Sequence, residues 1–199
     1  MTLDGAFTKL GDITTPHLCL HQMKIADAEA VFAFKSDPKV TLCYGQEPHR
    51  TIEETKIWLK KRVNDYEARG SVFWVLTLKD NDVAIGECCF WNFDPGFRSA
   101  EIGYELHSQY WHKGYMTEAV AEVIAYGFRE MDLHRIEACP YDNNNHSHDL
   151  LRKLGFKEEG RLRERHFFRG KFEDQLYFGL LRDEWKRQGQ DGKGDPHRA

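Results

Sequence analysis

The most regular hydrophobic pattern in the chain lies between residues 116 and 131. Apolar residues recur there at steps of three and four, at Met116, Ala119, Val120, Val123, Ile124, Gly127, Phe128 and Met131. Charged residues occupy the opposite positions, at Glu118, Glu122, Arg129 and Glu130. An α-helix has 3.6 residues per turn, so this spacing gathers the apolar residues on one face. The pattern predicts an amphipathic helix that packs against a core.

Three further segments carry helical signals. Asp27 is a candidate cap for a helix to about Ser36, with a face made of Ala28, Val31, Phe32 and Lys35. Thr51 and Glu54 fit the cap pattern Ser/Thr-x-x-Glu, and the helix that follows continues its face through Ile57, Trp58, Lys61 and Arg62. Residues 144–156 predict another helix, which Gly155 is positioned to end.

The remaining periodic segments predict strands. Residues 17–24 form a first strand, and residues 71–93 form two strands joined by a tight turn at Asn81 and Asp82. Residues 99–106 add a third strand to this antiparallel meander, and residues 134–140 form another. Residues 158–168 and 172–181 flank Arg169 and Gly170 as a final hairpin. The order β α α β β β α β α β β predicts an α/β fold, with a mixed sheet of about seven strands and four helices.

Length and composition favour one domain. The chain has 199 residues, and about 100–200 residues per domain is usual. We expect a single domain over residues 1–185. Residues 186–199 combine Gly, Pro and charge with nothing to bury, so we expect a disordered polar tail there. The last hairpin offers a sheet edge at which a homodimer could form.

Charge, hydropathy and cysteine use exclude several classes of protein. No apolar run approaches the roughly 20 residues needed to cross a bilayer, and the first residues lack the pattern of a secretory signal. Five cysteines without paired spacing indicate reduced thiols in the cytoplasm. A net charge of −4 gives no general attraction to phosphate backbones. We expect a cytoplasmic protein without membrane or direct nucleic-acid partners.

A glycine directly before the strongest helix suggests an anion site. Gly114 lies where the first turn of a helix presents unpaired N–H groups and the positive end of the helix dipole. A glycine admits a phosphate close to the backbone, and Lys113 adds a positive charge. The alternative is a structural turn. The chain has no Gly-x-Gly-x-x-Gly run and no nucleoside-triphosphate loop, so those two phosphate sites are excluded.

Three segments together resemble a known family. "SAEIGYEL", "YWHKGYMTEA" and "NNHSHDLLRKLGF", in this order, are similar to motifs of the GNAT superfamily of acetyl-CoA-dependent N-acetyltransferases. The chain most resembles the branch that acetylates the N-termini of ribosomal proteins, and the resemblance extends from about residue 16 to residue 185. It implies a twisted, mostly antiparallel sheet whose central strands splay apart to admit CoA.

The resemblance also implies which residues bind the cofactor. The family's phosphate-binding loop corresponds to Trp111, His112, Lys113, Gly114, Tyr115, Met116 and Thr117, with Trp111 and Met116 departing from the strict consensus. Backbone groups near Glu105, Leu106 and His107 are expected to pair with the amides of pantetheine. Asn144 matches the family Asn that reaches pantetheine.

Two carboxylates compete for the role of general base. An alkyl amine is almost fully protonated at pH 7, so transfer of an acetyl group requires a group that removes a proton. Glu101 resembles the position of a catalytic glutamate in several family members. Glu87, on the neighbouring predicted strand, is the rival. For either residue the alternative is a solvated carboxylate on a strand.

The departing thiolate requires a hydrogen-bond donor. Many family members place a Tyr on the helix after the pantetheine Asn, but the corresponding residue here is Leu151. The resemblance therefore transfers this role to Ser147, for which a helix cap is the alternative. Aromatic residues that could line an acceptor pocket, or simply pack in the core, are Tyr104, Tyr110, Trp111 and Tyr115. We expect no metal, because neither Cys88-Cys89 nor His146-x-His148 is joined by further ligand spacing.

The resemblance predicts an N-acetyltransferase that uses acetyl-CoA as co-substrate and catalyses direct attack by a primary amine. The expected acceptor is a protein N-terminus, such as that of a ribosomal protein. Two alternatives stay open at this point. One is acetylation of a small amine, such as a polyamine or an aminoglycoside, and the other is a module that binds acyl-CoA without turnover.

Overall fold

A single twisted sheet forms the centre of the molecule. The computed structural model describes residue 7, residues 10–80 and residues 83–190. Within these residues the sheet has eight strands in the order β1-β2-β3-β4-β5-β6-β8-β7. In chain order the strands are β1 (Ile13–Thr14), β2 (Leu18–Gln22), β3 (Ser71–Leu78), β4 (Ala84–Asp94), β5 (Ser99–Leu106), β6 (Arg135–Ala138), β7 (Lys157–Phe168) and β8 (Lys171–Leu181).

The strand directions confirm a mixed, mostly antiparallel sheet. β1 to β5 form an antiparallel meander, and β6, β8 and β7 pair antiparallel at the other end. β5 and β6 run parallel to each other and join the two parts. A parallel connection requires a crossover, and the strong amphipathic helix of the sequence supplies it.

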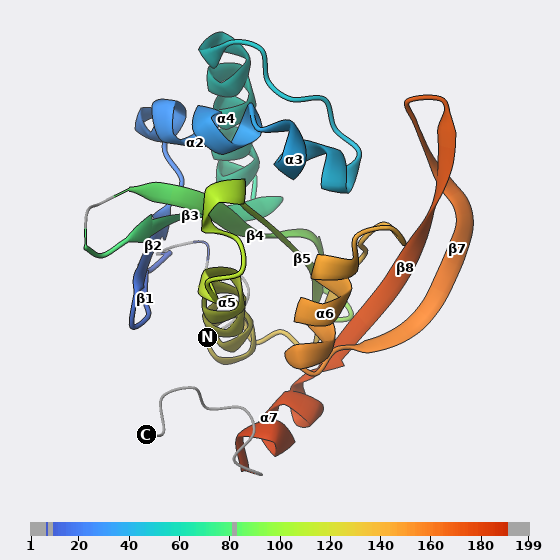
Figure 1. The fold of residues 1–199 in the computed structure, drawn as a ribbon. Helices are drawn as coiled ribbons and strands as arrows, with labels where there is room; N and C mark the ends of the chain where they lie inside the picture. The colour runs from blue at the N-terminus through green and yellow to red at the C-terminus, as the bar shows by residue number, and fades with distance from the viewer. Residues whose placement is uncertain (1–6, 8–9, 81–82, 191–199) are drawn as a thin grey trace.

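Helices cover both faces of the sheet. The described residues contain six α-helices: α2 (Ala28–Lys35), α3 (Pro38–Thr41), α4 (Ile52–Glu67), α5 (Tyr115–Arg129), α6 (Asn145–Lys153) and α7 (Arg182–Gln190). Short 3-10 turns are η1 (Ile25–Asp27), η2 (Leu42–Tyr44) and η3 (Ser108–Tyr110). In Figure 1, α2, α3 and α4 lie on one side of the sheet and α5 and α6 on the other. None of the described helices is both long and apolar enough to span a membrane.

The predicted counts of seven strands and four helices were too low. The additional strand, β1, has two residues, which is too short to show an alternating pattern. The additional helix α3 is a single turn with Asp37 as cap and Pro38 at its first position. The additional helix α7 carries mostly polar residues and therefore gives no apolar periodicity.

Two predicted segments, the polar tail and the turn before β4, lie partly or wholly outside the described residues. α7 continues to Gln190, so the first residues of the expected polar tail are helical, and residues 191–199 lie outside the described residues. The predicted turn at Asn81 and Asp82 also lies outside them.

The sheet separates two hydrophobic clusters. The larger cluster packs one face of β2 to β6 and β8 against α5, with Trp74, Phe90 and Phe178 fully buried. The smaller cluster lies between the other face and helices α2 and α4. Cys88 belongs to the first cluster and Cys89 to the second, as expected for adjacent residues of a strand.

The helix faces were predicted with unequal success. Every apolar residue predicted for the face of α5 is buried. In α2, Phe34 is fully buried in place of Phe32, and Lys35 is buried. In α4 the predicted face was right only in part. Trp58 packs against the smaller cluster and Arg62 is half-buried, but Thr55 and Leu59 are buried while Ile57 is 69% exposed. α4 has mainly charged residues, so its sequence carries a weak apolar stripe.

β5 and β6 are paired over only three residues. Ser99 to Glu101 lie opposite Arg135 to Glu137, and β5 then continues to Leu106 without a partner on that side in the described sheet. The two strands therefore separate beyond Glu101, which leaves backbone groups of β5 facing a gap.

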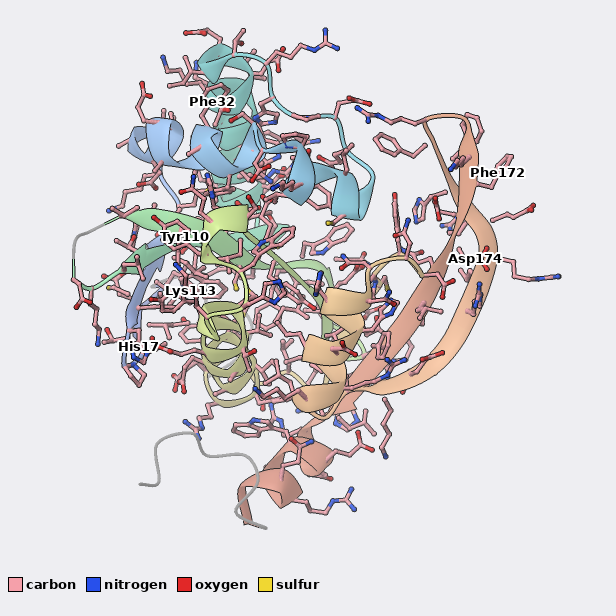
Figure 2. All side chains as sticks on the ribbon, in the orientation of Figure 1. His17, Phe32, Tyr110, Lys113, Phe172 and Asp174 are labelled. Carbon is pink, nitrogen blue, oxygen red and sulfur yellow. The ribbon has the colours of Figure 1, made fainter. Side chains whose placement is uncertain are left out.

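The final hairpin, β7–β8, is long and extends away from the rest of the molecule (Figure 1). Figure 2 shows Phe172 on its outer surface, where the ring packs against Phe167 with centroids 4.9 Å apart. Both rings are more than half exposed, so the far end of the hairpin has little contact with the core.

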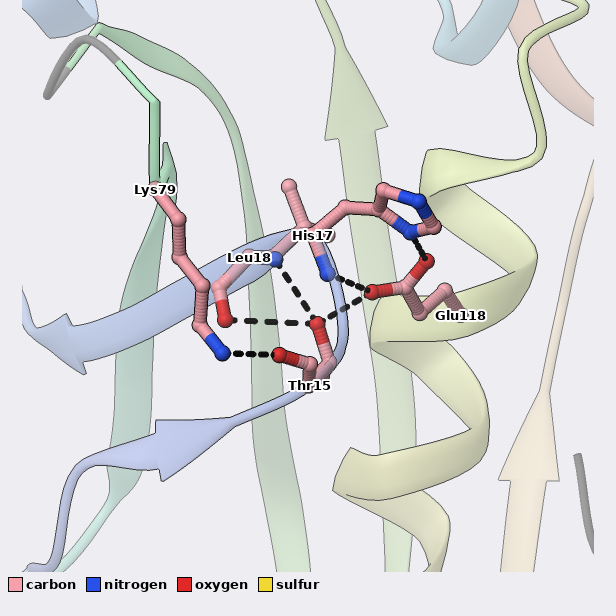
Figure 3. A network of polar contacts seen from close by, with 5 residues as sticks. All are labelled: Thr15, His17, Leu18, Lys79 and Glu118. Carbon is pink, nitrogen blue, oxygen red and sulfur yellow. Dashed lines mark hydrogen bonds and ion pairs between the residues drawn. The ribbon is translucent and has the colours of Figure 1, made fainter. Parts of the chain in front are cut away.

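A polar network fixes the first turn of α5 to the turn between β1 and β2 (Figure 3). His17 donates its backbone N–H to Glu118 Oε1 at 2.8 Å, and its Nδ1 lies 2.8 Å from Oε2. Thr15 donates its hydroxyl to the same carboxylate, and Lys79 donates to the carbonyl of Thr15. Burial opposes the charge on Glu118, but these hydrogen bonds outweigh it and lower its pKa. The start of α5 is thereby held rigidly beside the sheet.

Candidate active site

A cavity of about 930 Å³ opens where β5 and β6 separate. Its walls come from β4 and β5, residues 110–117, residues 138–150, residues 40–46 and the β7–β8 hairpin. Most of the predicted site residues line this cavity, namely Glu101, Glu105, Leu106, Trp111, His112, Gly114, Tyr115, Met116, Thr117, Asn144 and Ser147. Segments far apart in the sequence thus meet at one place.

One end of the cavity has the geometry of an anion site. Gly114 precedes the first residue of α5 and has φ +85°, and His112 also has a positive φ of 61°. A Cβ on Gly114 would have no neighbour within 4 Å, so the backbone here is open. The free N–H groups of the first helical turn can therefore meet an anionic group at close range. Such a cradle fits a diphosphate.

The loop before α5 is held against the end of β5. Trp111 donates its indole N–H to the carbonyl of Leu106 at 2.7 Å. Lys113 is not on the cavity wall, and its Nζ lies 5.2 Å from the centre of the Tyr110 ring, beside which Figure 2 shows it. Lys113 therefore contributes charge at a distance, and the backbone amides are the groups at the cavity.

His107 is a poor candidate for pairing with a cofactor. It is not on the cavity wall, and its backbone N–H donates to the carbonyl of Ile85 at 2.8 Å. Its carbonyl accepts from the backbone N–H of Tyr110 at 2.9 Å. Leu106 and Glu105 remain as the predicted pairing residues that line the cavity, and the carbonyl of Leu106 already accepts from Trp111.

Asn144 is the N-cap of α6 and lines the cavity. Its Oδ1 accepts from the backbone N–H of Ser147 at 3.2 Å, and its Nδ2 donates to the carbonyl of Cys43 at 3.3 Å. This amide links α6 to η2. One N–H of the amide and one acceptor position remain for a ligand.

Glu101 lies at the point where the two strands part. Its register partner on β6 is Glu137, and Trp91 is its partner on β4. Burial raises the pKa of Glu101 to about 7, and the negative charge of Glu137 adds to the rise, while hydrogen bonds with Cys139 and Asn92 oppose it. A carboxyl group with this pKa can accept a proton near neutral pH.

Glu87 occupies a different environment. Lys35 Nζ lies 3.1 Å from Glu87 Oε1 and also forms an ion pair with Glu105. Tyr44 donates its hydroxyl to Glu105 Oε2 at 2.6 Å, and the Lys35 ammonium lies 4.0 Å from the centre of the Trp58 ring. Lys35, Glu87 and Glu105 are all buried. We call Lys35, Tyr44, Glu87 and Glu105 the lysine cluster.

Burial and neighbouring charges shift the pKa values of Glu87 and Glu105 in opposite directions. Burial raises the pKa of Glu87 well above its usual value, and Glu105 adds to the rise. Burial also opposes ionisation of Glu105, but the charge of Lys35 and the hydrogen bonds from Glu87, Lys35 and Tyr44 lower its pKa. The shared environment therefore favours the neutral form of Glu87 and the ionised form of Glu105. The side chain of Glu105 pairs with Lys35 and accepts from Tyr44, whereas the resemblance pointed only to its backbone.

Ser147 has a partner that the sequence did not identify. Its Oγ lies 2.7 Å from the hydroxyl of Tyr104, which comes from β5 and also lines the cavity. Leu151, one turn further along α6, is fully buried and is not on the cavity wall. The alternation of side chains along β5 could have indicated this position, because it puts Glu101 and Glu105 on one face and Tyr104 on the other.

Lys35 and Tyr44 were also missed as cavity residues. Lys35 lies within the apolar face of α2, and a lysine at such a position signals a buried ion pair. Its partners come from β4 and β5 and could not be paired from the sequence. Among the described residues no group of three or more His, Cys, Asp or Glu side chains could hold a metal ion.

Comparison with known proteins agrees with this geometry. The family model described as "Acetyltransferase (GNAT) domain" matches residues 17–157. The chain is 32% identical over 170 residues to the uncharacterized N-acetyltransferase YoaA of Bacillus subtilis, covering 85% of this chain and 96% of that protein. It is 32% identical over 125 residues to the [ribosomal protein uS5]-alanine N-acetyltransferase of Escherichia coli, covering 62% and 64% of the two chains.

A solved structure shows the same fold. The ribosomal-protein-S5-alanine acetyltransferase of Vibrio fischeri superposes with a TM-score of 0.76 at 26% identity, covering 88% of this chain and 98% of that one. The match of the family model to most of the chain, together with these similarities, shows that the protein belongs to the GNAT family of acetyl-CoA-dependent N-acetyltransferases.

Proposed function

We propose that the protein transfers the acetyl group of acetyl-CoA to the N-terminal amine of a protein, with a ribosomal protein as the acceptor. The names of two similar proteins, which act on alanine of ribosomal protein uS5 or S5, support this acceptor class. The observation that carries the proposal is the position and pKa of Glu101 on the cavity wall.

The pKa of Glu101 suits an α-amine. An N-terminal α-amine has a pKa of about 7.7–8.0, whereas a lysine side chain has a pKa of about 10.4. A base with a pKa of about 7 is therefore close to the α-amine but several units below an alkyl amine. A general base works best when its pKa lies near the operating pH, and an α-amine has a larger neutral fraction there than a lysine side chain, so Glu101 and an α-amine together suit attack near neutral pH.

The residues present fit acetyl-CoA as co-substrate. The amides at Gly114 and the first turn of α5 would hold its diphosphate, and the backbone of β5 near Glu105 and Leu106 would pair with its amides. The bound thioester supplies an activated acetyl group. The chain places Glu101 on one face of β5 and Tyr104, with Ser147, on the other.

The reaction then requires two tasks of the protein. Glu101 takes a proton from the attacking amine, directly or through one water, so that the nitrogen can form a bond to the acetyl carbon. The carbon–sulfur bond breaks, and its electron pair leaves with sulfur. The hydroxyl group of Ser147 lies on the cavity wall as a hydrogen-bond donor for that sulfur.

The experiment compares acceptors and variants while the release of free CoA thiol is followed. Wild-type protein should acetylate peptides with a free N-terminal Ala or Ser, and should not acetylate the same peptides blocked at the N-terminus but containing lysine. Glu101→Gln should lower kcat by about 10²–10⁴. Glu87→Gln removes the rival carboxyl group, whose pKa burial raises well above the usual value, and its activity should remain.

Two outcomes would overturn the proposal. Full activity of Glu101→Gln, with loss in Glu87→Gln instead, would transfer the role of base to Glu87. Faster turnover of a polyamine or an aminoglycoside than of any peptide or ribosomal protein would make the protein a small-amine acetyltransferase.

A further inference from the structure

We propose that Tyr104 is a positioning residue for departure of the CoA thiolate: its hydroxyl donates to Ser147 Oγ, so that the single hydroxyl proton of Ser147 is directed at sulfur. This inference rests on the proposed function and adds a residue to it. It starts from the 2.7 Å contact between the two hydroxyl groups on the wall of the cavity.

The two residues reach this contact from separate elements. Tyr104 belongs to the part of β5 that has no partner toward β6, and Ser147 belongs to the first turn of α6. The N-cap Asn144 accepts from the backbone N–H of Ser147 and donates to the carbonyl of Cys43. These two hydrogen bonds hold the first turn of α6, and with it Ser147, in place. The hydroxyl pair therefore spans the gap between β5 and α6 and has a fixed position.

The proposed base, Glu101, and the residue that positions the sulfur donor, Tyr104, lie on opposite faces of β5. Alternation places Glu101 and Glu105 on the face toward α2 and α4, and Tyr104 on the face that packs against the larger hydrophobic cluster. An attacking amine and a departing sulfur occupy different positions around the acetyl carbon. A base and a sulfur donor on opposite faces of one strand satisfy this requirement.

The direction of the hydrogen bond decides what Ser147 can do. A serine hydroxyl has one proton and accepts through its lone pairs. If Tyr104 donates to Ser147, the serine proton is free for sulfur. Tyrosine is the stronger acid of the two and therefore the better donor, and burial raises the pKa of Tyr104, which keeps its proton in place at neutral pH. Each hydrogen bond in such a chain strengthens the next one.

The chemistry balances without transfer of a proton from the hydroxyl pair. The amine proton goes to Glu101, the new bond joins nitrogen to the acetyl carbon, and the electron pair of the broken carbon–sulfur bond stays on sulfur. Ser147 donates a hydrogen bond to the resulting thiolate and retains its proton. Tyr104 acts on sulfur only through Ser147.

Calorimetric titration with CoA and with desulfo-CoA tests this without an acceptor. A free thiol has a pKa of about 8.5, so a donor aimed at sulfur should favour the thiolate of CoA as the pH rises. In the wild type, the affinity ratio of CoA to desulfo-CoA should increase between pH 6 and pH 9. In Tyr104→Phe the rise of the affinity ratio between pH 6 and pH 9 should be smaller than in the wild type by on the order of tenfold. In Ser147→Ala the ratio should not change with pH.

Matched variants separate this role from a structural one. Tyr66 also uses its hydroxyl for one hydrogen bond, to the carbonyl of Phe7 at 3.0 Å, and it is not on the cavity wall. Tyr66→Phe should leave the ratio unchanged at every pH. In the Ser147→Ala background, Tyr104→Phe should cause no further change in the ratio, because Tyr104 acts through the serine.

The inference is overturned if Tyr104→Phe keeps the wild-type ratio across the pH range, or if the ratio does not depend on pH in the wild type. Should Tyr104→Phe not fold, 3-fluorotyrosine at position 104 keeps the ring and strengthens the donor, and it should increase the ratio at high pH. Because no amine is present, a negative result here is distinguishable from failure of the proposed acceptor.

Discussion

Glu101 and Glu87 lie on neighbouring strands and differ in what surrounds them. Glu101 lies at the cavity, and its pKa is raised to about 7, mainly by burial and further by the charge of Glu137, its register partner on β6. Glu87 is buried beside Lys35 and Glu105, and burial raises its pKa well above the usual value. The resemblance favoured Glu101 as the base and kept Glu87 as its rival, and the surroundings of the two carboxyl groups support the same order in the proposed mechanism.

Replacement of Glu137 by Gln should move the pH dependence of the reaction. The charge of Glu137 contributes to the raised pKa of Glu101, although burial is the larger cause. A base acts in its ionised form, so activity rises as the pH passes its pKa. In Glu137→Gln the rise of kcat/KM should occur at a lower pH, although still above the pH of a free carboxyl group.

Glu159→Gln is the control for this experiment. Glu159 and Glu137 both bind the guanidinium of Arg135, but Glu159 does not contribute to the pKa of Glu101. The pH profile of Glu159→Gln should match the wild type. Equal shifts in both variants would show that Arg135, and not the charge near Glu101, sets the profile.

Lys35→Met should destabilise the protein strongly. It leaves ionised Glu105 buried without its counter-charge, and removal of one partner of a buried ion pair costs about 3–5 kcal/mol. The free energy of unfolding, measured by chemical denaturation, reports this. Since protonation of Glu105 relieves the penalty, the loss should diminish as the pH falls.

Lys39→Met is the matched control, because Lys39 is exposed on the adjacent helix α3. It should change the free energy of unfolding by less than about 0.5 kcal/mol. A small effect of Lys35→Met at neutral pH would contradict an ionised pair in the lysine cluster.

At the scale of elements, the start of α5 combines strain with open space. Gly114 has φ +85°, a conformation that costs an L-residue roughly 1–2 kcal/mol, and a Cβ there would enter the space in which we place the diphosphate. Gly114→Ala should therefore raise the Kd for CoA by about tenfold, as measured by calorimetry.

Gly170→Ala separates strain from binding. Gly170 has φ +79°, and a Cβ there would also have no neighbour within 4 Å, but it lies in the turn between β7 and β8. Both variants should lose similar stability. Only Gly114→Ala should lose affinity for CoA, and an unchanged Kd in that variant would place the diphosphate elsewhere.

The elements with a strong apolar period were predicted best. Every residue predicted for the apolar face of α5 is buried, with Ala125 in addition, and the antiparallel meander of β3 to β5 was predicted as well. α4 is stabilised by a cap at Thr51 and by packing of Leu59. Its apolar residues follow only a weak period, so Ile57 was wrongly assigned to the buried face. β1 and α3 are too short to carry a period.

At the scale of the whole molecule, two distant segments meet at the cavity. Arg169, at the tip of the β7–β8 hairpin, forms two hydrogen bonds of 2.8 and 2.7 Å with Glu47, which follows η2. Gln46 on one side and Arg165 and His166 on the other line the cavity. The ion pair between Arg169 and Glu47 therefore links two walls of the cavity that are far apart in the sequence.

Arg169→Glu should alter acceptor binding more than stability. The pair is exposed to solvent, so its loss should change the free energy of unfolding little. With the hairpin no longer fixed, the KM for a peptide acceptor should rise while the KM for acetyl-CoA stays constant. The exchanged variant Glu47→Arg with Arg169→Glu should restore the KM. A rise that persists after the exchange would contradict the role of the ion pair.

Long-range pairing set the limit of prediction at this scale. The residues of the cavity wall could be proposed from three motifs, but the Lys35–Glu87 and Tyr104–Ser147 contacts join residues that are 52 and 43 positions apart in the sequence. Neither a spacing nor a period encodes such contacts. The insertion of β6 between β5 and β8 brings Ser147 to Tyr104, and it follows from packing of the entire sheet.

A crystal structure of the protein with CoA would test the central claim most directly. The account predicts the diphosphate on the backbone amides beside Gly114, pantetheine along β5 beyond Glu101, and sulfur within hydrogen-bond distance of Ser147 Oγ. A diphosphate bound away from the first turn of α5, or pantetheine outside the gap between β5 and β6, would contradict it.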